Sequence, residues 1–180
     1  MKKLFPLLLI FLFLSSCGYK AGTNSSDQQS VNTCICQNDF CEYCVKVVSI
    51  TDGDTFRGLT KDNEEIKFRI YGIDAPENHQ AFGKRSTQHL ADLIFGKSVG
   101  IKVQSTDYFG RFVVWVYTPD GKDVGAEMLK AGMAWHFKKY DKSKEYASFE
   151  NNARMERVGL WVDKNPIEPW NFRREKKKKK

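Results

Sequence analysis

Short blocks of alternating apolar and polar residues in the middle of the chain are typical of β-strands. In the stretch EIKFRIYG, the apolar side chains of Ile66, Phe68 and Ile70 alternate with charged ones. Such alternation buries one side of a strand and leaves the other side in solvent. The pattern predicts five strands, the second of which follows a turn, within residues 45–51, 52–60, 65–72, 98–105 and 111–118.

A different spacing, close to four residues, predicts helices. Ser86, Leu90 and Ile94 recur at steps of four, as residues on one helix face do. Asp123 is a suitable N-cap for a second, short helix, because its side chain can accept a hydrogen bond from the first turn. The three predicted helices cover residues 82–95, 123–130 and 143–158.

This order of elements predicts the fold class. Five strands with a helix between the third and the fourth are the order of an OB-fold barrel. A meander of separate hairpins has the same number of strands, but the interposed helix favours the barrel. We therefore expect a mainly β fold with α-helices (α+β), a five-stranded OB-fold β-barrel with about three helices.

Composition divides the chain into one folded domain and its flanking segments. The 180 residues, of which 41% are hydrophobic and 13% aromatic, are enough for one domain with a substantial core. We expect this domain at residues 45–172. The flanking segments are a signal peptide (1–16), a polar flexible tether (17–33), a cysteine-rich segment (34–44) and a basic tail (173–180), which is predicted to be disordered.

The N-terminus resembles a bacterial lipoprotein signal. Lys2 and Lys3 precede an apolar run at residues 4–14, which is too short to span a bilayer. The following LSSCG resembles a lipobox, which implies cleavage before Cys17 and a stable anchor of several acyl chains on its thiol. The alternative is an ordinary secretory signal with a chance cysteine. In both cases the protein is exported, either anchored at the bacterial cell envelope or secreted.

Four further cysteines lie close together, and they are Cys34, Cys36, Cys41 and Cys44. In an intracellular protein this spacing would suggest a metal-binding knuckle. Outside the cytoplasm, two disulfide bonds are the simpler interpretation. Four cysteines allow three pairings, and the sequence does not choose among them.

The formal net charge of +7 comes from the two ends of the chain. Without Lys2, Lys3 and the lysines at 176–180, basic and acidic residues are equal in number, at 22 each. The overall charge therefore says little about the partner of the folded domain. A binding surface must come from local segregation of charge.

Two aspartates are expected to meet at the ends of the second and third strands. If KDNE joins these strands as a hairpin, position 54 lies opposite roughly position 71, and Asp54 is close to Asp74. Neighbouring carboxylates repel each other unless a cation or a shared proton lies between them. Hard oxygen ligands without a neighbouring Cys or His suit Ca²⁺ or Mg²⁺ better than zinc.

Arg69, Arg111 and Glu77 add the other parts of a phosphoryl-transfer site. Guanidinium groups bind phosphate oxygens through two parallel hydrogen bonds, and a carboxylate can take a proton from water. Each residue also has a purely structural explanation. Arg69 can be a solvated strand residue, Arg111 a hairpin end and Glu77 a favourable charge at a helix entrance, and DGD is a common turn motif.

The combination of motifs resembles one family. ITDGDT, FRIYGIDAPE, DYFGR and GLW, in this order and spacing, resemble the thermonuclease (staphylococcal nuclease-like, SNase-like) family over roughly residues 45–170. The resemblance implies an OB barrel with three helices. It also implies Ca²⁺-dependent hydrolysis of DNA and RNA phosphodiesters, with release of 3′-phosphate ends.

The same resemblance implies roles for individual residues. One Ca²⁺ ion is expected to be held by the side chains of Asp54 and Asp74 and by the main-chain carbonyl of Ala75. Arg69 and Arg111 are expected to be the catalytic pair that binds the phosphate. Glu77 is expected to activate or orient the attacking water.

Three positions depart from the best-known family member. That protein has threonine where Ala75 stands, a change that keeps a main-chain ligand and removes a hydroxyl group. It has Lys-Tyr where this chain has Tyr108 and Phe109, so the lysine and phenol contacts to a terminal phosphate are absent here. The family's preference for chain ends is therefore an open question for this chain.

The stretch GMAWHFKKY interleaves aromatic and basic residues. Aromatic rings beside basic groups suit single-stranded or frayed nucleic acid, because every base can stack. Candidates for such contacts are Lys138 and Tyr140, together with Tyr108. The alternative is that Trp135 and Phe137 fill the core and the lysines are solvated. The lysine tail can hold polyanions, such as DNA or an anionic membrane surface, in a salt-sensitive way.

The sequence therefore predicts an exported, lipid-anchored, Ca²⁺-dependent nuclease that acts on DNA and RNA, and we expect it to be a monomer. Two alternatives stay open at this point. One is a non-catalytic nucleic-acid-binding OB-fold lipoprotein. The other is a surface lipoprotein whose cysteine segment contacts another protein.

Overall fold

The computed structural model describes residues 41–178, and all structural statements below refer to this part of the chain. The predicted signal peptide, the lipidation candidate Cys17, the tether, Cys34 and Cys36 lie outside the described residues. Between residues 41 and 178, no helix has the length and apolar character needed to cross a membrane.

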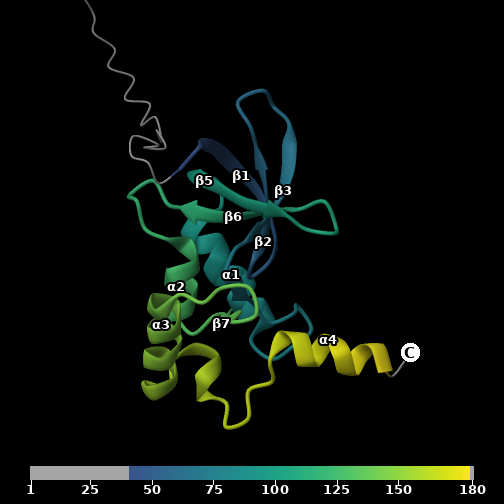
Figure 1. Ribbon diagram of the computed structural model, residues 1–180, viewed down its shortest axis with the longest axis vertical. Coiled ribbons are helices and arrows are strands. Elements are labelled where there is room, and N and C mark those ends of the chain that lie inside the picture. Colours follow the sequence, from purple (N-terminus) through teal and green to yellow (C-terminus); the bar gives the residue numbers. More distant parts are fainter. Residues whose placement is uncertain (1–40, 179–180) are drawn as a thin grey trace, which may run out of the picture. The chain divides into compact units, whose positions relative to one another are not determined.

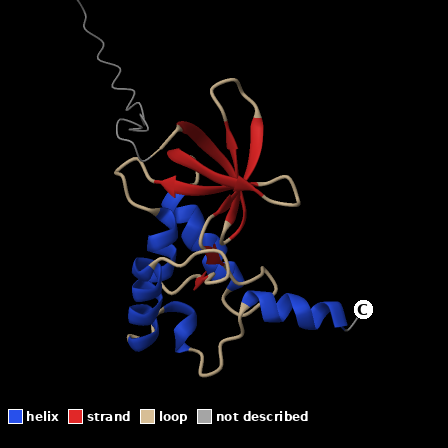
Figure 2. Ribbon diagram, viewed as in Figure 1, coloured by secondary structure: helices blue, strands red, loops and turns tan. Residues whose placement is uncertain are grey.

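Five strands close into a barrel, which confirms the predicted fold class (Figures 1 and 2). β1 (Tyr43–Asp52), β2 (Thr55–Leu59) and β3 (Glu65–Ile70) pair antiparallel in sequence order. β6 (Phe112–Tyr117) pairs parallel with β3 and antiparallel with β5 (Ser98–Thr106). β5 returns to β1 and closes the barrel in the order β1-β2-β3-β6-β5, as in an OB-fold.

The alternating pattern of the sequence fills the interior of the barrel. Phe68 and Ile70 are buried on β3, as their spacing predicts. Phe68 stacks on Phe56 of β2, with 5.2 Å between the ring centroids. These cross-strand contacts fix which face of β2 and β3 points into the barrel. They also fix the register of the two strands, and the register decides which residues at the start of β2 and the end of β3 lie side by side.

The predicted helices are present and lie together at one end of the barrel (Figure 2). α1 (Gly83–Ile94) stands between β3 and β5 in the chain. α2 (Val124–Lys130) begins after Asp123, whose side chain accepts a hydrogen bond from the Ala126 amide at 3.2 Å. α3 (Lys144–Met155) begins after Ser143, which caps it in the same way through the Tyr146 amide.

The β2–β3 hairpin is one residue tighter than predicted. Thr55 pairs with Arg69, and the Ile70 amide donates to the Asp54 carbonyl at 2.8 Å, so position 54 lies opposite 70 rather than 71. The turn holds three residues instead of four, because Asn63 adopts a left-handed conformation with φ of 60°. Asparagine tolerates this conformation better than most residues.

Two short strands extend the structure beyond the barrel. β4 (Ile73–Asp74) follows directly after β3, and β7 (Trp135–His136) pairs with it antiparallel. This pairing holds Asp74 in an extended backbone conformation close to the C-terminal end of β3.

The prediction of a disordered tail from residue 173 was wrong for the described part of that segment. After the 3₁₀ turn η1 (Gly159–Val162), the helix α4 runs from Pro169 to Lys178 and crosses the predicted domain boundary at 172. Proline suits the first turn of a helix, and Arg, Lys and Glu are good helix formers. Trp170 fixes the start of α4 by stacking on Phe137, with 5.3 Å between the ring centroids.

The described part of the cysteine-rich segment contains two of its four cysteines. Cys41 and Cys44 each take part in a disulfide bond. The pairing of all four cysteines stays a prediction, since Cys34 and Cys36 lie outside the described residues.

Candidate active site

A cavity of about 810 Å³ opens beside the ends of β2 and β3. It is bordered by the loop between β5 and β6 and by one side chain of α4. The predicted site residues in its wall are Asp54, Arg69, Ala75, Glu77 and Arg111. The sixth, Asp74, is not part of the cavity wall, but its carboxylate accepts a hydrogen bond from Arg69, which is.

Asp54 is buried, and both of its carboxylate oxygens accept hydrogen bonds. The Thr55 hydroxyl donates to its Oδ1 at 2.8 Å, and the Ala75 amide donates to its Oδ2 at 2.9 Å. Gly53, just before it, lets this turn approach α1, since a Cβ atom there would lie 1.8 Å from the Ser86 hydroxyl oxygen. The middle residue of DGD is therefore required by packing, and it helps to fix the direction of the Asp54 carboxylate.

Asp54 and Asp74 converge on one cation, the guanidinium group of Arg69. Arg69 donates to Asp54 Oδ1 from Nη1 and to Asp74 Oδ1 from Nη2, both at 2.7 Å. Burial raises the pKa of Asp74, and hydrogen bonds from Arg173 and the charge of Arg69 oppose this effect. The two carboxylates meet as the sequence predicts, with the positive charge of an arginine between them.

Arg111 approaches the same cluster from the loop between β5 and β6. Its Nε donates to Asp107 Oδ2 at 2.7 Å, and its Nη1 lies 3.5 Å from the Thr55 hydroxyl oxygen. Although burial alone would raise the pKa of Asp107, hydrogen bonds from Arg111 lower it. Arg111 is thus held in place by Asp107 and linked to Asp54 through Thr55.

Glu77 lines the cavity and pairs with a residue that the sequence analysis missed. Arg173 of α4 donates from Nη1 to Glu77 Oε1 and from Nη2 to Asp74 Oδ2, both at 2.7 Å. Arg173 belongs to the segment that was predicted to be a disordered tail. No local pattern could have brought it here, because 99 residues separate it from Asp74.

Asp52 is a second residue that the sequence analysis did not single out. It lines the cavity, and its Oδ1 accepts a hydrogen bond from the Asp54 amide at 3.1 Å. Burial, together with the charge of Asp54, raises the pKa of Asp52 to about 7. The signal in the sequence was DGD itself, which places two carboxylates two residues apart.

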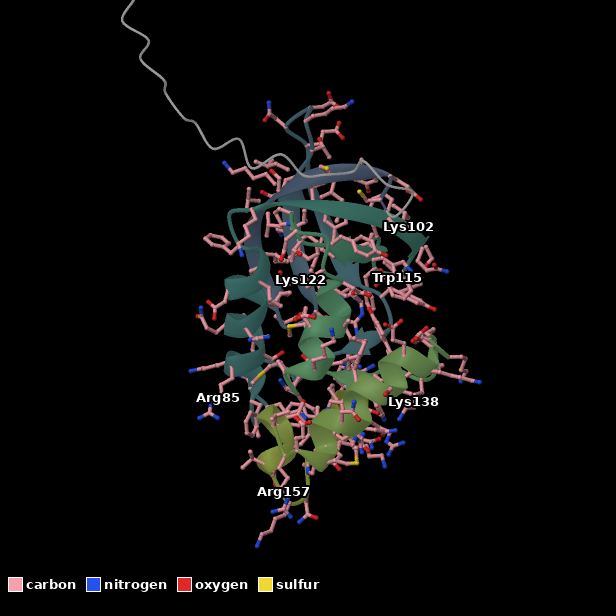
Figure 3. The ribbon with its side chains drawn as sticks, turned by 90° about the vertical axis from the view of Figure 1, so that its left-hand side faces the viewer. Arg85, Lys102, Trp115, Lys122, Lys138 and Arg157 are labelled. Atoms are coloured by element: carbon pink, nitrogen blue, oxygen red, sulfur yellow. The ribbon has the colours of Figure 1, made fainter. Side chains whose placement is uncertain are left out.

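The candidates for nucleic-acid contacts separate into two places. Tyr108 and Tyr140 line the active-site cavity and are 97% and 60% exposed. Lys138, labelled in Figure 3, does not reach this cavity; its Nζ donates to the buried Glu150 at 2.7 Å. Trp135 is buried, as the core alternative for this stretch expects.

The donor atoms fit a hard divalent cation. Among residues 41–178, no three His, Cys, Asp or Glu side chains gather into a metal-binding cluster. The predicted ligand set, however, needs only two side chains, from Asp54 and Asp74, and the main-chain carbonyl of Ala75. Both carboxylates already point at one positively charged group, and oxygen ligands of this kind suit Ca²⁺.

Comparisons with known proteins place most of the folded region in one group of related sequences. The family model for staphylococcal nuclease homologues matches residues 67–163. A Haemophilus influenzae protein described as an uncharacterized endonuclease is 40% identical over 171 residues, which cover 95% of this chain and 84% of that protein. An Escherichia coli O157:H7 protein with the same description is 36% identical, over 73% of this chain and 85% of its own.

A plant protein is similar over a smaller part of its length. The staphylococcal-like nuclease CAN1 of Arabidopsis thaliana is 42% identical over 127 residues. These residues cover 68% of this chain but only 39% of the plant protein.

Proposed function

Because the chain belongs to the staphylococcal nuclease family, we propose that this nuclease uses one Ca²⁺ ion to hydrolyse DNA and RNA phosphodiesters and leaves 3′-phosphate ends. The observation that supports the proposal best is the convergence of Asp54 and Asp74 on one cationic group, with Arg111 and Glu77 beside them. This combination can hold a phosphodiester, stabilise the charge that develops on its oxygens and take a proton from the attacking water.

Each residue of the cavity has a role in the proposed reaction. Arg69 and Arg111 donate paired hydrogen bonds to the phosphate oxygens, on which negative charge grows as water attacks. Glu77 takes the proton of that water, the bond between phosphorus and the 5′-oxygen breaks, and the leaving 5′-oxygen takes up a proton from solvent to become a hydroxyl. When bound by Asp54 and Asp74, the Ca²⁺ ion supplies further positive charge that polarises the phosphate.

The proposal is tested by what the protein does to nucleic acid. Mature protein incubated with plasmid DNA, or with RNA, in Ca²⁺-containing buffer is expected to cut the strands. A 3′-labelling or extension assay is expected to fail on the products until phosphatase removes their 3′-phosphates. A protein that retards DNA in a gel without cutting it would contradict the proposal and favour a non-catalytic binder, and products with free 3′-hydroxyl ends would contradict the proposed direction of cleavage.

We further propose that the nuclease is exported and anchored by lipid at Cys17, which the lipobox-like LSSCG supports. Expression in a bacterium fed with labelled fatty acid is expected to label the wild-type protein and not the Cys17→Ser variant. Cys34→Ser serves as a matched control, and it is expected to keep the label. An unlabelled wild-type protein in the culture medium would instead indicate an ordinary secretory signal.

A further inference from the structure

A third arginine lies in the proposed active site and comes from the C-terminal helix. Arg173 of α4 holds both oxygens of Asp74, at 3.2 Å for Nη1 to Oδ1 and 2.7 Å for Nη2 to Oδ2. Its Nη1 also lies 2.7 Å from Glu77 Oε1. One guanidinium group therefore bridges a proposed ion ligand and the proposed proton acceptor.

These contacts occupy the atoms that the ion needs. Asp74 Oδ1 accepts hydrogen bonds from Arg69 and Arg173, and Asp74 Oδ2 accepts one from Arg173. An ion that approaches Asp74 from the side of Glu77 meets a positive group at hydrogen-bond distance from both carboxylates. Because like charges repel strongly in a partly buried site, the ion and Arg173 compete for the same oxygens.

The packing of α4 allows its later part to move while its start stays fixed. Trp170 lies between Phe137, on which it stacks, and Trp135, with ring centroids 5.3 and 5.9 Å away. Beyond Arg173, the side chains of residues 174–178 are exposed. Arg173 is thus the last residue of α4 that is packed against the site, and its own side chain is 39% exposed.

We propose that Arg173 is a displaceable counter-ion of the active site. It neutralises Asp74 and Glu77 while the divalent cation is absent, and it leaves Asp74 when the cation binds. Arg173 thereby sets the cation concentration at which Asp74 becomes free to bind the ion and Glu77 free to act on water. The inference rests on the proposed cation site and adds a residue that controls its occupancy.

The direct test is the affinity for Ca²⁺, measured by titration calorimetry on the mature protein without nucleic acid. Arg173→Ala is expected to bind Ca²⁺ about tenfold more tightly than the wild type, a change of about 1.4 kcal/mol, because the competing charge is gone. Arg173→Lys keeps the positive charge but not the forked geometry of the guanidinium group, and its Ca²⁺ affinity is expected to lie between those of the wild type and Arg173→Ala. Arg174→Ala is the matched control, since Arg174 is the next residue of the same helix and is exposed, and its affinity is expected to equal that of the wild type.

A second measurement follows the helix itself. Hydrogen exchange of the amides at 170–178 is expected to become faster in the wild type when Ca²⁺ is added, because the release of Arg173 loosens the end of α4. In Arg173→Ala the same amides are expected to exchange fast with and without Ca²⁺.

The outcomes separate this inference from the proposed function. Equal Ca²⁺ affinity of the wild type and Arg173→Ala would overturn the inference and leave the cation site intact. If that variant instead lost affinity for a short oligonucleotide, Arg173 would be a third phosphate-binding group rather than a counter-ion. If none of the variants bound Ca²⁺, the proposed cation site itself would be wrong, and the inference with it.

Discussion

Removal of Ca²⁺ by a chelator is expected to lower the rate of DNA cleavage about a thousandfold. In the structure, Arg69 forms ion pairs with Asp54 and Asp74, and both of its Nη atoms are bound to these carboxylates. An arginine in that position is not free to receive the phosphate. The loss of the ion therefore removes its own charge and also keeps Arg69 on the acids, and each tenfold change in rate needs only about 1.4 kcal/mol.

The measurement is the initial rate of cleavage of a fluorescent oligonucleotide as the free Ca²⁺ concentration is varied with EGTA. Addition of excess Ca²⁺ is expected to restore the full rate. Asp54→Asn removes one ligand charge, so the half-saturating Ca²⁺ concentration is expected to rise at least about tenfold. Asp62→Asn, in the exposed turn between β2 and β3, serves as the control and is expected to match the wild type. Cleavage at an undiminished rate in EGTA would contradict the Ca²⁺ requirement.

The strands and helices could be predicted from the sequence because the patterns that specify them lie within short stretches of the chain. Alternation on each strand decides which side chains are buried, and Phe68 and Ile70 lie in the core as that alternation requires. Capping residues such as Asp123 and Ser143 mark where helices begin, and both make the expected hydrogen bonds. Neither prediction needs knowledge of distant parts of the chain.

The meeting of Asp54 and Asp74 could also be predicted, since a hairpin relates the two positions by counting. The count was wrong by one residue because it assumed a four-residue turn, whereas Asn63 closes the turn after three. The error did not separate the two acids. Asp74 follows β3 by only a few residues, and β4 holds it in place beside the barrel.

The partner of Glu77 could not be predicted, because it depends on how α4 docks. The arginines and lysines at the end of the chain look like a solvated tail when they are considered alone. What makes them a helix over the site is the stacking of Trp170 on Phe137, a contact between side chains distant in sequence. Propensity allowed the helix, and tertiary packing decided its position.

The choice of partner by Arg69 could not be predicted either. The sequence places an arginine next to two acids and, through the family resemblance, next to a phosphate. Only the structure shows that the two acids hold its side chain, with one Nη atom 2.7 Å from each carboxylate. The same side chain can serve both partners in turn, because its forked group binds carboxylate and phosphate with the same geometry.

Glu77→Gln is expected to lower the rate of cleavage at saturating Ca²⁺ at least about a hundredfold, the contribution typical of a positioned general base. The amide has nearly the shape of the carboxylate but cannot take the proton of the attacking water. The substitution also removes the negative charge that pairs with Arg173, whose Nη1 lies 2.7 Å from Glu77 Oε1.

The effect on Ca²⁺ binding distinguishes lost chemistry from lost structure. If Arg173 competes with the ion, Glu77→Gln removes one of the two carboxylates that hold Arg173 in the site, and the variant is expected to bind Ca²⁺ at least as tightly as the wild type. If Glu77 acts on water, the same variant is expected to cut far more slowly. Glu64→Gln, at the exposed residue just before β3, is the matched control and is expected to keep the wild-type rate. Near-normal cleavage by Glu77→Gln would remove Glu77 from the mechanism, whereas a parallel loss of Ca²⁺ affinity would make it a ligand of the ion instead of a base.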